Sequence, residues 1–561
     1  MRIVNRIIII STISTIPLSA AKPNIENIPN VNSSIIDKQI RTLKDIPSKN
    51  KEIIDIEDSK SIDLSKDDKS NKTILIKKFK IEGNTKIPTN TILEKIKKFE
   101  NRKLTFKQLK EVTQIITKLY RDEGYFVARA YIPVQNIQSD NILKIKILEG
   151  KYGEFKLDNK SLVEDSIVQK IFNNSKNSEV IDYKALQKAI LLVNDRAGII
   201  VSKAQISPGE EVGSSDFNLE TIATPRLDGY IVADNYGSRY TGLYRAQTLV
   251  NINSLAKIGD KISLSGIISN RADLKNARIV YELPLNSYGL TANLAYSKTK
   301  YNLVKEYKKL DAYGDSNIYE VGLSYALLLS IDEALYTKIK YYHKDLDDYI
   351  YGDKYENKYI NSFVVSLDYK KNYYIFDFFS RLFGFLDLTT GNLSTASSKI
   401  QDGRYNKVDL YISNEVVFNS IFSLNTTLTA QKTLSNKNLD GNEQLSLGGA
   451  YGVKVYPYSE KNGENGYIFS NEILTVLPNI SFYNHKIGLF YDIGDVYRQK
   501  AKLDSEFQRK RLQDIGLGYY VKYKDFFAKA QMAWTVNSQH INSENSSHKN
   551  SKLLLQAGMV F

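Results

Sequence analysis

A strict two-residue alternation of apolar and polar side chains in residues 223–561 limits the folds open to this chain more than any other feature. In DIGLGYYVKYKD, Ile515, Leu517 and Tyr519 share one face, and AKAQMAWTV alternates in the same way. These strands run nearer ten residues than the five or six usual in a soluble β-sandwich. Strands of this length, with Tyr near their ends, are typical of a transmembrane antiparallel β-barrel. At roughly 20 residues per strand and loop, the segment predicts about sixteen strands.

No segment after the N-terminus has 18 consecutive apolar residues, so the sequence predicts no transmembrane helix. The 39 Tyr suit a surface with one apolar side and one wet side. The last nine residues, LLLQAGMVF, alternate up to an aromatic residue with no loop behind it. We therefore expect the last strand to close on the first, with Phe561 as the C-terminal barrel signal.

The N-terminus indicates export. Arg2 and Arg6 precede an apolar run, and small residues follow it, which predicts a secretory signal peptide over residues 1–21. Export makes nucleic acid an improbable partner, despite the formal charge of +14. The absence of Cys fits an exported bacterial protein and excludes disulfide and thiolate-metal chemistry.

Residues 22–73 predict a solvated linker, because Lys, Asp, Ser and Asn dominate them. Within the linker, Ile36, Ile40 and Leu43 fall on one helical face. An amphipathic helix over residues 34–47 and a fraying coil remain open as alternatives.

Residues 74–222 predict two small α/β modules in tandem, at 74–150 and 151–222. The first has the order β-α-α-β-β, with Thr105 capping its second helix and Gly124 ending it. We expect strands at 74–82, in YFVARAYIPVQ and in ILKIKILEG. The second module repeats the order, and its second helix ends at Gly198.

Exposed strand edges in such modules can pair with an extended chain. In the first module the second helix and the strand YFVARAYIP predict a substrate-binding groove. The predicted groove residues are Leu109, Val112, Ile116, Tyr125, Val127, Arg129 and Tyr131.

One loop, GGAYGVKVYP at 448–457 with its flank, places a single cation among glycines and tyrosines. A distant stretch, GLFYDIGDV, alternates so that Asp492 faces away from Leu489 and Tyr491. If those apolar side chains face lipid, the carboxylate points into the lumen. An ordinary surface hairpin with a solvated lysine is the alternative for the loop.

Several segments together resemble the two-partner secretion translocators (TpsB, or haemolysin secretion/activation proteins), over roughly residues 74–561. They are LLVNDRAGIIVSKAQISPGEEVGSSDFNLE, ADNYGSRYTGLYRAQ with IGDKISLS, YELPL, LGGAYGVKVYPYSEKNGENGYIFSNEI and LFYDIGDV. The resemblance implies α+β tandem POTRA modules (74–150 and 151–222) followed by a sixteen-stranded transmembrane β-barrel (223–561). It also implies that the 34–47 helix can plug the lumen.

By this resemblance, the loop folds into the barrel and Lys454 docks on Asp492. The loop-motif residues are Gly448, Gly449, Gly452, Val453, Tyr456 and Pro457. The family usually has Arg where this chain has Lys454, and a small residue where it has Val455. A lysine offers a point charge instead of a planar fork, which puts the rigidity of the loop in doubt.

The sequence predicts no enzyme, metal site or cofactor: the four His are scattered, and no HExxH, P-loop or GxSxG motif occurs. We expect a monomeric outer-membrane translocator with periplasmic modules, which passes one large unfolded exoprotein, a TpsA-like adhesin or haemolysin, to the cell surface. The expected further partners are outer-membrane lipid, the barrel assembly machinery and periplasmic chaperones. The alternatives are an outer-membrane protein assembly factor and a passive porin.

Overall fold

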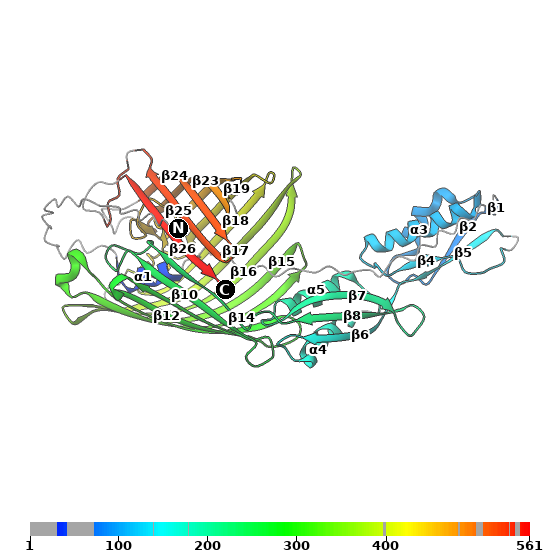
Figure 1. Ribbon diagram of the computed structural model, residues 1–561, viewed down its shortest axis with the longest axis horizontal. Coiled ribbons are helices and arrows are strands. Elements are labelled where there is room, and N and C mark those ends of the chain that lie inside the picture. Colours follow the sequence, from blue (N-terminus) through cyan, green and yellow to red (C-terminus); the bar gives the residue numbers. More distant parts are fainter. Residues whose placement is uncertain are drawn as a thin grey trace, which may run out of the picture.

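The computed structural model describes residues 31–41, 72–137, 140–177, 179–396, 400–478, 480, 483–500, 509–537, 539–544 and 550–561. It consists of a wide β-barrel with two α/β modules extending in line from one side of its rim (Figure 1). The predicted signal peptide, most of the linker, and Leu43 lie outside the described residues. Among the residues that are described, no helix combines the length and apolarity needed to cross a membrane.

The first module, farthest from the barrel, packs two helices on a three-stranded sheet of order β2-β5-β4, with β1 and β3 paired beside it (Figure 1). Its elements are β1 Thr73–Ile76, β2 Lys78–Glu82, α2 Thr89–Ile96, η2 Lys97–Phe99, β3 Arg102–Thr105, α3 Phe106–Asp122, β4 Arg129–Tyr131 and β5 Ile142–Leu148. Thr105 forms a capping box with Gln108 at the start of α3, as its sequence position predicts. Gly124 follows the helix at φ +96°, a conformation that favours glycine.

Two strand predictions in this module are wrong. The strand predicted at 74–82 is divided at Lys77 into β1 and β2, which join different sheets. The strand predicted in YFVARAYIPVQ is reduced to the three residues of β4. Phe126 and Val127 instead pack against the hydrophobic core of the second module, so this segment links the two modules.

The second module repeats the order with β6 Lys151–Lys160, α4 Asp165–Asn174, η3 Ser175–Asn177, α5 Tyr183–Asn194, β7 Ile200–Pro208 and β8 Ser214–Ile222. It is fixed to the first module by backbone hydrogen bonds from Tyr183 N to Gly124 O and from Ile181 N to Gly150 O, both 3.0 Å. The ring of Phe126 meets that of Tyr183 edge to face at 5.6 Å. The two modules therefore share a packed junction.

The second module also contacts the barrel at three consecutive periplasmic turns. The buried Arg196 guanidinium donates to Ile258 O at 2.6 Å and to Asn286 O at 2.8 Å, which lie in two of these turns. Beside the third, Tyr336 on β15 (Glu333–Ile350) donates to the Asp195 carboxylate at 2.7 Å. Burial lowers the pKa of Arg196.

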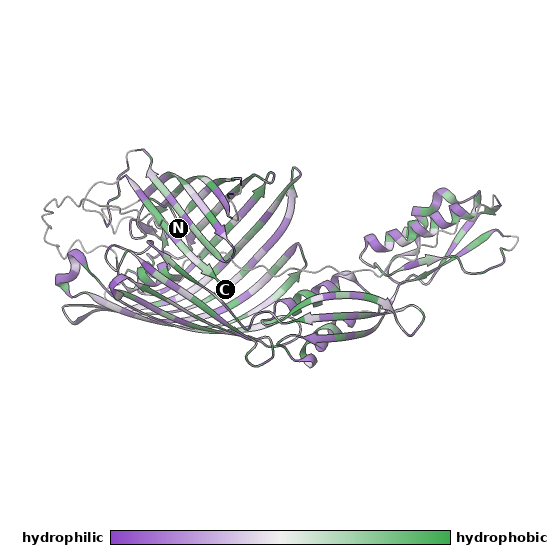
Figure 2. Cartoon of the chain, in the orientation of Figure 1, coloured by the Kyte–Doolittle hydropathy of each residue, from purple (hydrophilic) through white to green (hydrophobic). Residues whose placement is uncertain are grey.

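The barrel closes with sixteen antiparallel strands, as predicted. They are β9 Leu227–Asp234, β10 Arg245–Asn253, β11 Lys261–Ser269, β12 Leu274–Pro284, β13 Leu290–Asn302, β14 Tyr313–Leu329, β15 Glu333–Ile350, β16 Asp353–Ile375, β17 Phe378–Thr395, β18 Gly403–Val417, β19 Phe422–Thr433, β22 Asn465–Val476, β23 Asn484–Tyr497, β24 Arg509–Tyr523, β25 Phe526–Thr535 and β26 Ser551–Val560. Short 3-10 turns, η4 Asn270–Ala272 and η5 Lys305–Leu310, occupy two of the outer loops. Hydrophobic and hydrophilic bands alternate along the strands (Figure 2), which is the pattern expected of a wall between lipid and a wet lumen.

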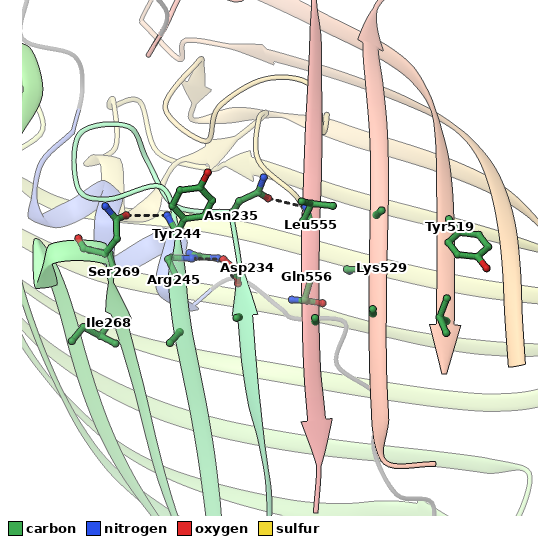
Figure 3. Close-up of a pocket in the computed structure, with 17 residues that line it drawn as sticks. Asp234, Asn235, Tyr244, Arg245, Ile268, Ser269, Tyr519, Lys529, Leu555 and Gln556 are labelled. Atoms are coloured by element: carbon green, nitrogen blue, oxygen red, sulfur yellow. Dashed lines mark hydrogen bonds and ion pairs between the residues drawn. The ribbon is translucent and has the colours of Figure 1, made fainter. Parts of the chain in front are cut away.

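The closure seam joins β26 to β9. Its register runs only from Gln556–Asp234 to Val560–Tyr230, which is shorter than any other pairing among the described barrel strands. Beyond it, Phe561 and Gly229 exchange two backbone hydrogen bonds of 3.0 and 3.1 Å, so the final residue takes part in closure. A cavity of about 760 Å³ lies at this seam (Figure 3).

A short helix, α1 Ser33–Arg41, lies inside the barrel (Figure 1). Its Ile36 and Ile40 join a buried cluster with inward residues of the wall and outer loops, including Tyr301. Ser33 donates through N and Oγ to the Asp348 carboxylate on β15, both at 2.9 Å. The predicted helix is therefore present in its described part, residues 33–41, and one end of it is fixed to the wall, whereas residues 42–47 of the prediction lie outside the described residues.

Candidate functional site: the lumen loop and the periplasmic modules

The loop between β19 and β22, residues 434–464, folds back against the inner wall. It contains η6 Gly441–Glu443 and a small ladder of β20 Leu445–Ser446 with β21 Asn462–Gly463. Gly448 has no room for a side chain, because a Cβ there would lie 1.9 Å from Pro457 O, and Gly449 sits at φ +103°. The Gly449 N–H donates to Tyr456 O at 2.8 Å. These glycines thus allow the tight turn that presents Lys454 to the wall.

Lys454 contacts the inner wall through Asp492 on β23. Its Nζ lies 2.7 and 2.9 Å from the two carboxylate oxygens and 4.4 Å from the centre of the Phe490 ring. The Asp492 side chain is fully buried, whereas the neighbouring Leu489 is half exposed on the outer surface. The structure therefore brings the two predicted partners together, on the predicted faces of the strand.

A second carboxylate, Asp514 on β24, was missed by sequence reasoning. Asp514 lies directly opposite Asp492 in the strand register and is fully buried. Its Oδ2 accepts a hydrogen bond from Val455 N at 2.7 Å, while Oδ1 has no hydrogen-bond partner among the described atoms. Two buried carboxylates thus face one ammonium group, so the charge of Lys454 is the one that compensates them at the tip of the loop.

Apolar packing completes the contact between loop and wall. Val453, Val455 and Tyr456 are fully buried. They pack in one cluster with Leu445, Leu447, Ile468, Phe490, Val496, Leu512, Ala533 and Ile541. The loop is therefore an inserted element of the lumen, and the alternative of a solvated surface hairpin is wrong.

The base of the loop is held by buried lysines of the wall, another feature that sequence reasoning missed. Lys344 contacts Glu443 at 2.5 Å, Lys407 contacts Glu443 at 3.1 Å, and Lys358 contacts Asp440 at 2.9 Å. The sequence does contain a signal for these lysines. The alternation of each strand places its lysine on the face that points into the lumen, where a buried cation needs an acidic partner.

The same loop base contacts the lumen helix. Asn442 donates to Asp37 Oδ2 at 2.8 Å and to Ser34 O at 3.1 Å, so α1 rests on the inserted loop as well as on the wall. The helix and the loop therefore form one connected body inside the barrel.

In the first module, three predicted groove residues are wrongly assigned. Leu109, Val112 and Ile116 lie in the module's own hydrophobic core, with 4%, 0% and 0% of their surfaces exposed. Side chains this deeply buried hold α3 on the sheet and offer no contact to a substrate. Tyr125 packs partly on the same core, and Val127 on that of the second module.

Arg129 and Tyr131, by contrast, are exposed on β4, which is the edge strand of its sheet. One outward N–H of that edge is already used, because Ala130 N donates to the Thr117 hydroxyl of α3 at 3.0 Å. An added strand would have to displace this hydrogen bond. The accessible part of the prediction is thus reduced to Arg129 and Tyr131, whose side chains share the exposed face of the sheet with Leu148 and Lys146, opposite the face on which α3 packs.

Glu149 fixes the end of β5 next to the module junction. Its carboxylate accepts from Thr85 N at 2.6 Å, Lys86 N at 2.9 Å, the Tyr120 hydroxyl at 2.9 Å and the Thr85 hydroxyl. Burial alone would raise the pKa of Glu149, but these hydrogen bonds outweigh it and hold the pKa below its usual value.

A closed sixteen-stranded barrel with an inserted loop and periplasmic α/β modules defines an outer-membrane translocator of the POTRA-plus-barrel class. The model of the haemolysin secretion/activation protein family ShlB/FhaC/HecB matches residues 213–519, and that of the ShlB-type POTRA domain matches residues 74–150. The first match covers more than half of the chain, which therefore belongs to the haemolysin secretion/activation family.

Curated relatives agree with this family. The chain is 28% identical over 451 residues to the heme/hemopexin transporter protein HuxB of Haemophilus influenzae, covering 78% of each protein. It is 21% identical over 425 residues to the outer membrane transporter CdiB of Dickeya dadantii, covering 69% of this chain and 72% of that protein. The solved structure of CdiB from Escherichia coli superposes with a TM-score of 0.72 at 18% identity, covering 90% of this chain and 93% of CdiB. The chain is thus an outer-membrane two-partner secretion translocator with its POTRA region in the periplasm, and this family excludes the porin and assembly-factor alternatives.

Proposed function

We propose that this translocator captures one large exoprotein as an extended chain on its periplasmic modules and passes it unfolded through the barrel to the cell surface. Sheet edges support the capture step: β7 in the second module and β4 in the first are edge strands, and pairing at β4 would displace the hydrogen bond from Ala130 N to Thr117. Main-chain pairing at an edge accepts many sequences, which suits an unfolded substrate.

We further propose that the inserted loop and α1 form the gate of the lumen. The contacts that support this are the pair of Lys454 with Asp492, and the resting of α1 on Asn442 and Asp348. Passage of a polypeptide requires α1 to leave the lumen. The hydrogen bonds from Asn442 mean that its departure loosens the loop base as well.

The single observation that carries the capture step is the exposed edge strand of the first module, with Arg129 and Tyr131 beside it. Deleting residues 74–150 should stop export of the exoprotein encoded in the neighbouring reading frame, while the barrel still inserts and keeps its heat-modifiable mobility on gels. A matched double substitution, Arg129→Ser with Tyr131→Ser, tests the edge without removing the fold. Normal export by both variants would contradict the capture role.

Reading the neighbouring reading frame is the observation that would identify the cargo. Adhesin, haemolysin and contact-dependent toxin are candidates, and the names of the relatives, heme/hemopexin transporter and hemolysin transporter, support two cargo classes to be assayed first. We propose that the chain works as a monomer, with no catalytic step and no cofactor. Its other partners in this proposal are outer-membrane lipid, the barrel assembly machinery, which would read Phe561, and periplasmic chaperones.

A further inference from the structure

The hairpin between β16 and β17 carries an exposed aromatic tip at the periplasmic end of the barrel. Phe376, at the turn, exposes 88% of its surface, and Tyr374 exposes 73%. Both turn residues have left-handed backbones, with φ +46° at Phe376 and +68° at Asp377. Such a turn favours Asn-Gly, and a bulky residue there is strained. A phenylalanine that is both strained and exposed contributes little to folding, which indicates a contact with something outside the chain.

The tip extends beyond the lipid headgroups. On the outer face of β16 the continuous run of exposed apolar side chains ends at Leu367, and Lys371 then pairs with Glu333 at 3.5 Å, which we take as the polar boundary of the bilayer; Ile375 is exposed again beyond this pair. Five further residues to Phe376 add about 17 Å along the strand, or about 13 Å along the membrane normal at a tilt of about 40°. The headgroup region is only about 5–8 Å thick on each side, so Phe376 projects into the periplasm.

One edge of this hairpin has no partner strand. The pairing of β16 with β15 ends at Lys371 with Glu333, whereas its pairing with β17 continues to Ile375 with Phe378. In the part of the chain that the structure describes, no strand pairs with the outer edge of residues 373–375. An extended polypeptide added there would continue the sheet at the point where β15 stops.

Both faces beside that edge offer rings and charge. On the lumen side Tyr374 meets Phe379 at 5.7 Å, and the Arg381 guanidinium lies 5.1 Å from the centre of the Phe379 ring. On the other side Phe378 meets Phe418 edge to face at 5.2 Å. Rings and a cation suit the apolar and aromatic side chains of an unfolded segment without selecting one sequence.

The surface continues from the contact between the second module and the barrel. A cavity of about 390 Å³ at the base of the hairpin is lined by Ser330–Ala334 from one turn and by Lys370, Lys371, Asn372 and Arg381, among others. In that same turn, Ile331 N donates to Gln187 of α5 at 3.4 Å. The hairpin therefore begins where the second module ends, at the mouth of the barrel.

We propose that this hairpin, residues 372–381, is a docking site for the exported chain, which pairs as an extended strand with residues 373–375 on its way from the second module into the lumen. The inference rests on the proposed capture function and adds a second contact point to it. Lipid, a periplasmic chaperone and a second copy of this chain are the competing occupants that the experiment excludes.

The test distinguishes the contribution of the Phe376 ring to export from the contribution of the turn to folding. Replacing Phe376→Asn together with Asp377→Gly gives the residues that this turn prefers, so the barrel should insert at least as well as the native one. Export of the exoprotein encoded in the neighbouring reading frame should nevertheless fall about fivefold or more, which is the effect expected when an interface residue with a moderate share of the binding energy is removed. Unchanged export by this variant would overturn the inference.

A photo-cross-linking amino acid at position 376 identifies the occupant. With that exoprotein co-expressed in a bacterial host, position 376 should give an adduct containing it. Position 524, in another two-residue periplasmic turn with Lys524 at φ +51°, should give none. Adducts only with lipid, chaperone or a second copy, or equal adducts from both positions, would overturn the inference. Failure of the native chain to export the exoprotein would instead refute the proposed function.

Discussion

Removing the charge of Lys454 tests whether its ion pair with Asp492 holds the tip of the inserted loop. Its Nζ lies 2.7 Å from a fully buried carboxylate, and Asp514 adds a second carboxylate directly opposite the first. Lys454→Ala leaves both carboxylates buried without their cation, a change that typically costs about 3–5 kcal/mol. Every 1.4 kcal/mol is about tenfold in population, so the released loop should become at least about a hundredfold more populated.

The expected result is a selective loss of export. The barrel strands do not depend on this pair, so heat-modifiable barrel in outer-membrane fractions should stay near the native amount while exoprotein in the medium falls at least tenfold. Lys454→Met keeps the length and the packing on Phe490 and should lose export to a similar extent. Lys454→Arg should retain export, because a planar fork can reach Asp514 as well as Asp492.

Two results would refute the role assigned to the ion pair between Lys454 and Asp492. If export and barrel abundance fall in proportion, Lys454 acts in folding and has no separate part in transport. If Lys454→Met exports normally, packing holds the loop and the charge pair is dispensable.

Three further predictions concern other contacts. Deleting residues 30–50, which include α1, should raise the ion conductance of the barrel in planar bilayers, and unchanged conductance would exclude a plug. Arg196→Ala removes two charged hydrogen bonds worth about 1.5–3 kcal/mol each, so limited trypsin treatment should cut faster after Arg226, at the start of the barrel, than in the native chain. Glu149 has a lowered pKa in the folded state, so the stability it provides is full above its unfolded pKa of about 4.3 and is lost as the pH falls through the lower folded value. Acid unfolding of the isolated 72–150 segment should therefore shift to higher pH in the Glu149→Gln variant, if that segment folds alone, and an unchanged midpoint would contradict the assignment.

The barrel could be predicted from the sequence because its signal is local. In a strand with lipid on one side, apolar side chains recur every two residues. Ile515, Leu517 and Tyr519 show this period within a single strand, so no information about neighbouring strands is needed. Thr105 is equally local, since a cap and its partner lie three residues apart. The place of Asp492 followed from the same alternation along GLFYDIGDV.

Features that depend on distant partners were not predictable in this way. An apolar stripe such as Leu109, Val112 and Ile116 has the same pattern whether it faces a core or a groove, and only the packed sheet decides. The strand expected around Phe126 failed because its side chain enters the core of another module. Asp514 lies opposite Asp492 through a register that no single strand reveals.

The one-sided attachment of the second module has a mechanical consequence. Arg196 binds the turns between β10 and β11 and between β12 and β13, and Asp195 binds Tyr336 on β15; these contacts cover one arc of the rim, and no equivalent contact to the remaining turns is seen in the described residues. These contacts fix the orientation of the second module relative to the barrel, so it does not rotate about a hinge. Any polypeptide bound to the module therefore enters the pore from the same side of the rim. Tension on that polypeptide from outside the cell would load the contacts between module and barrel and would not reorient the module.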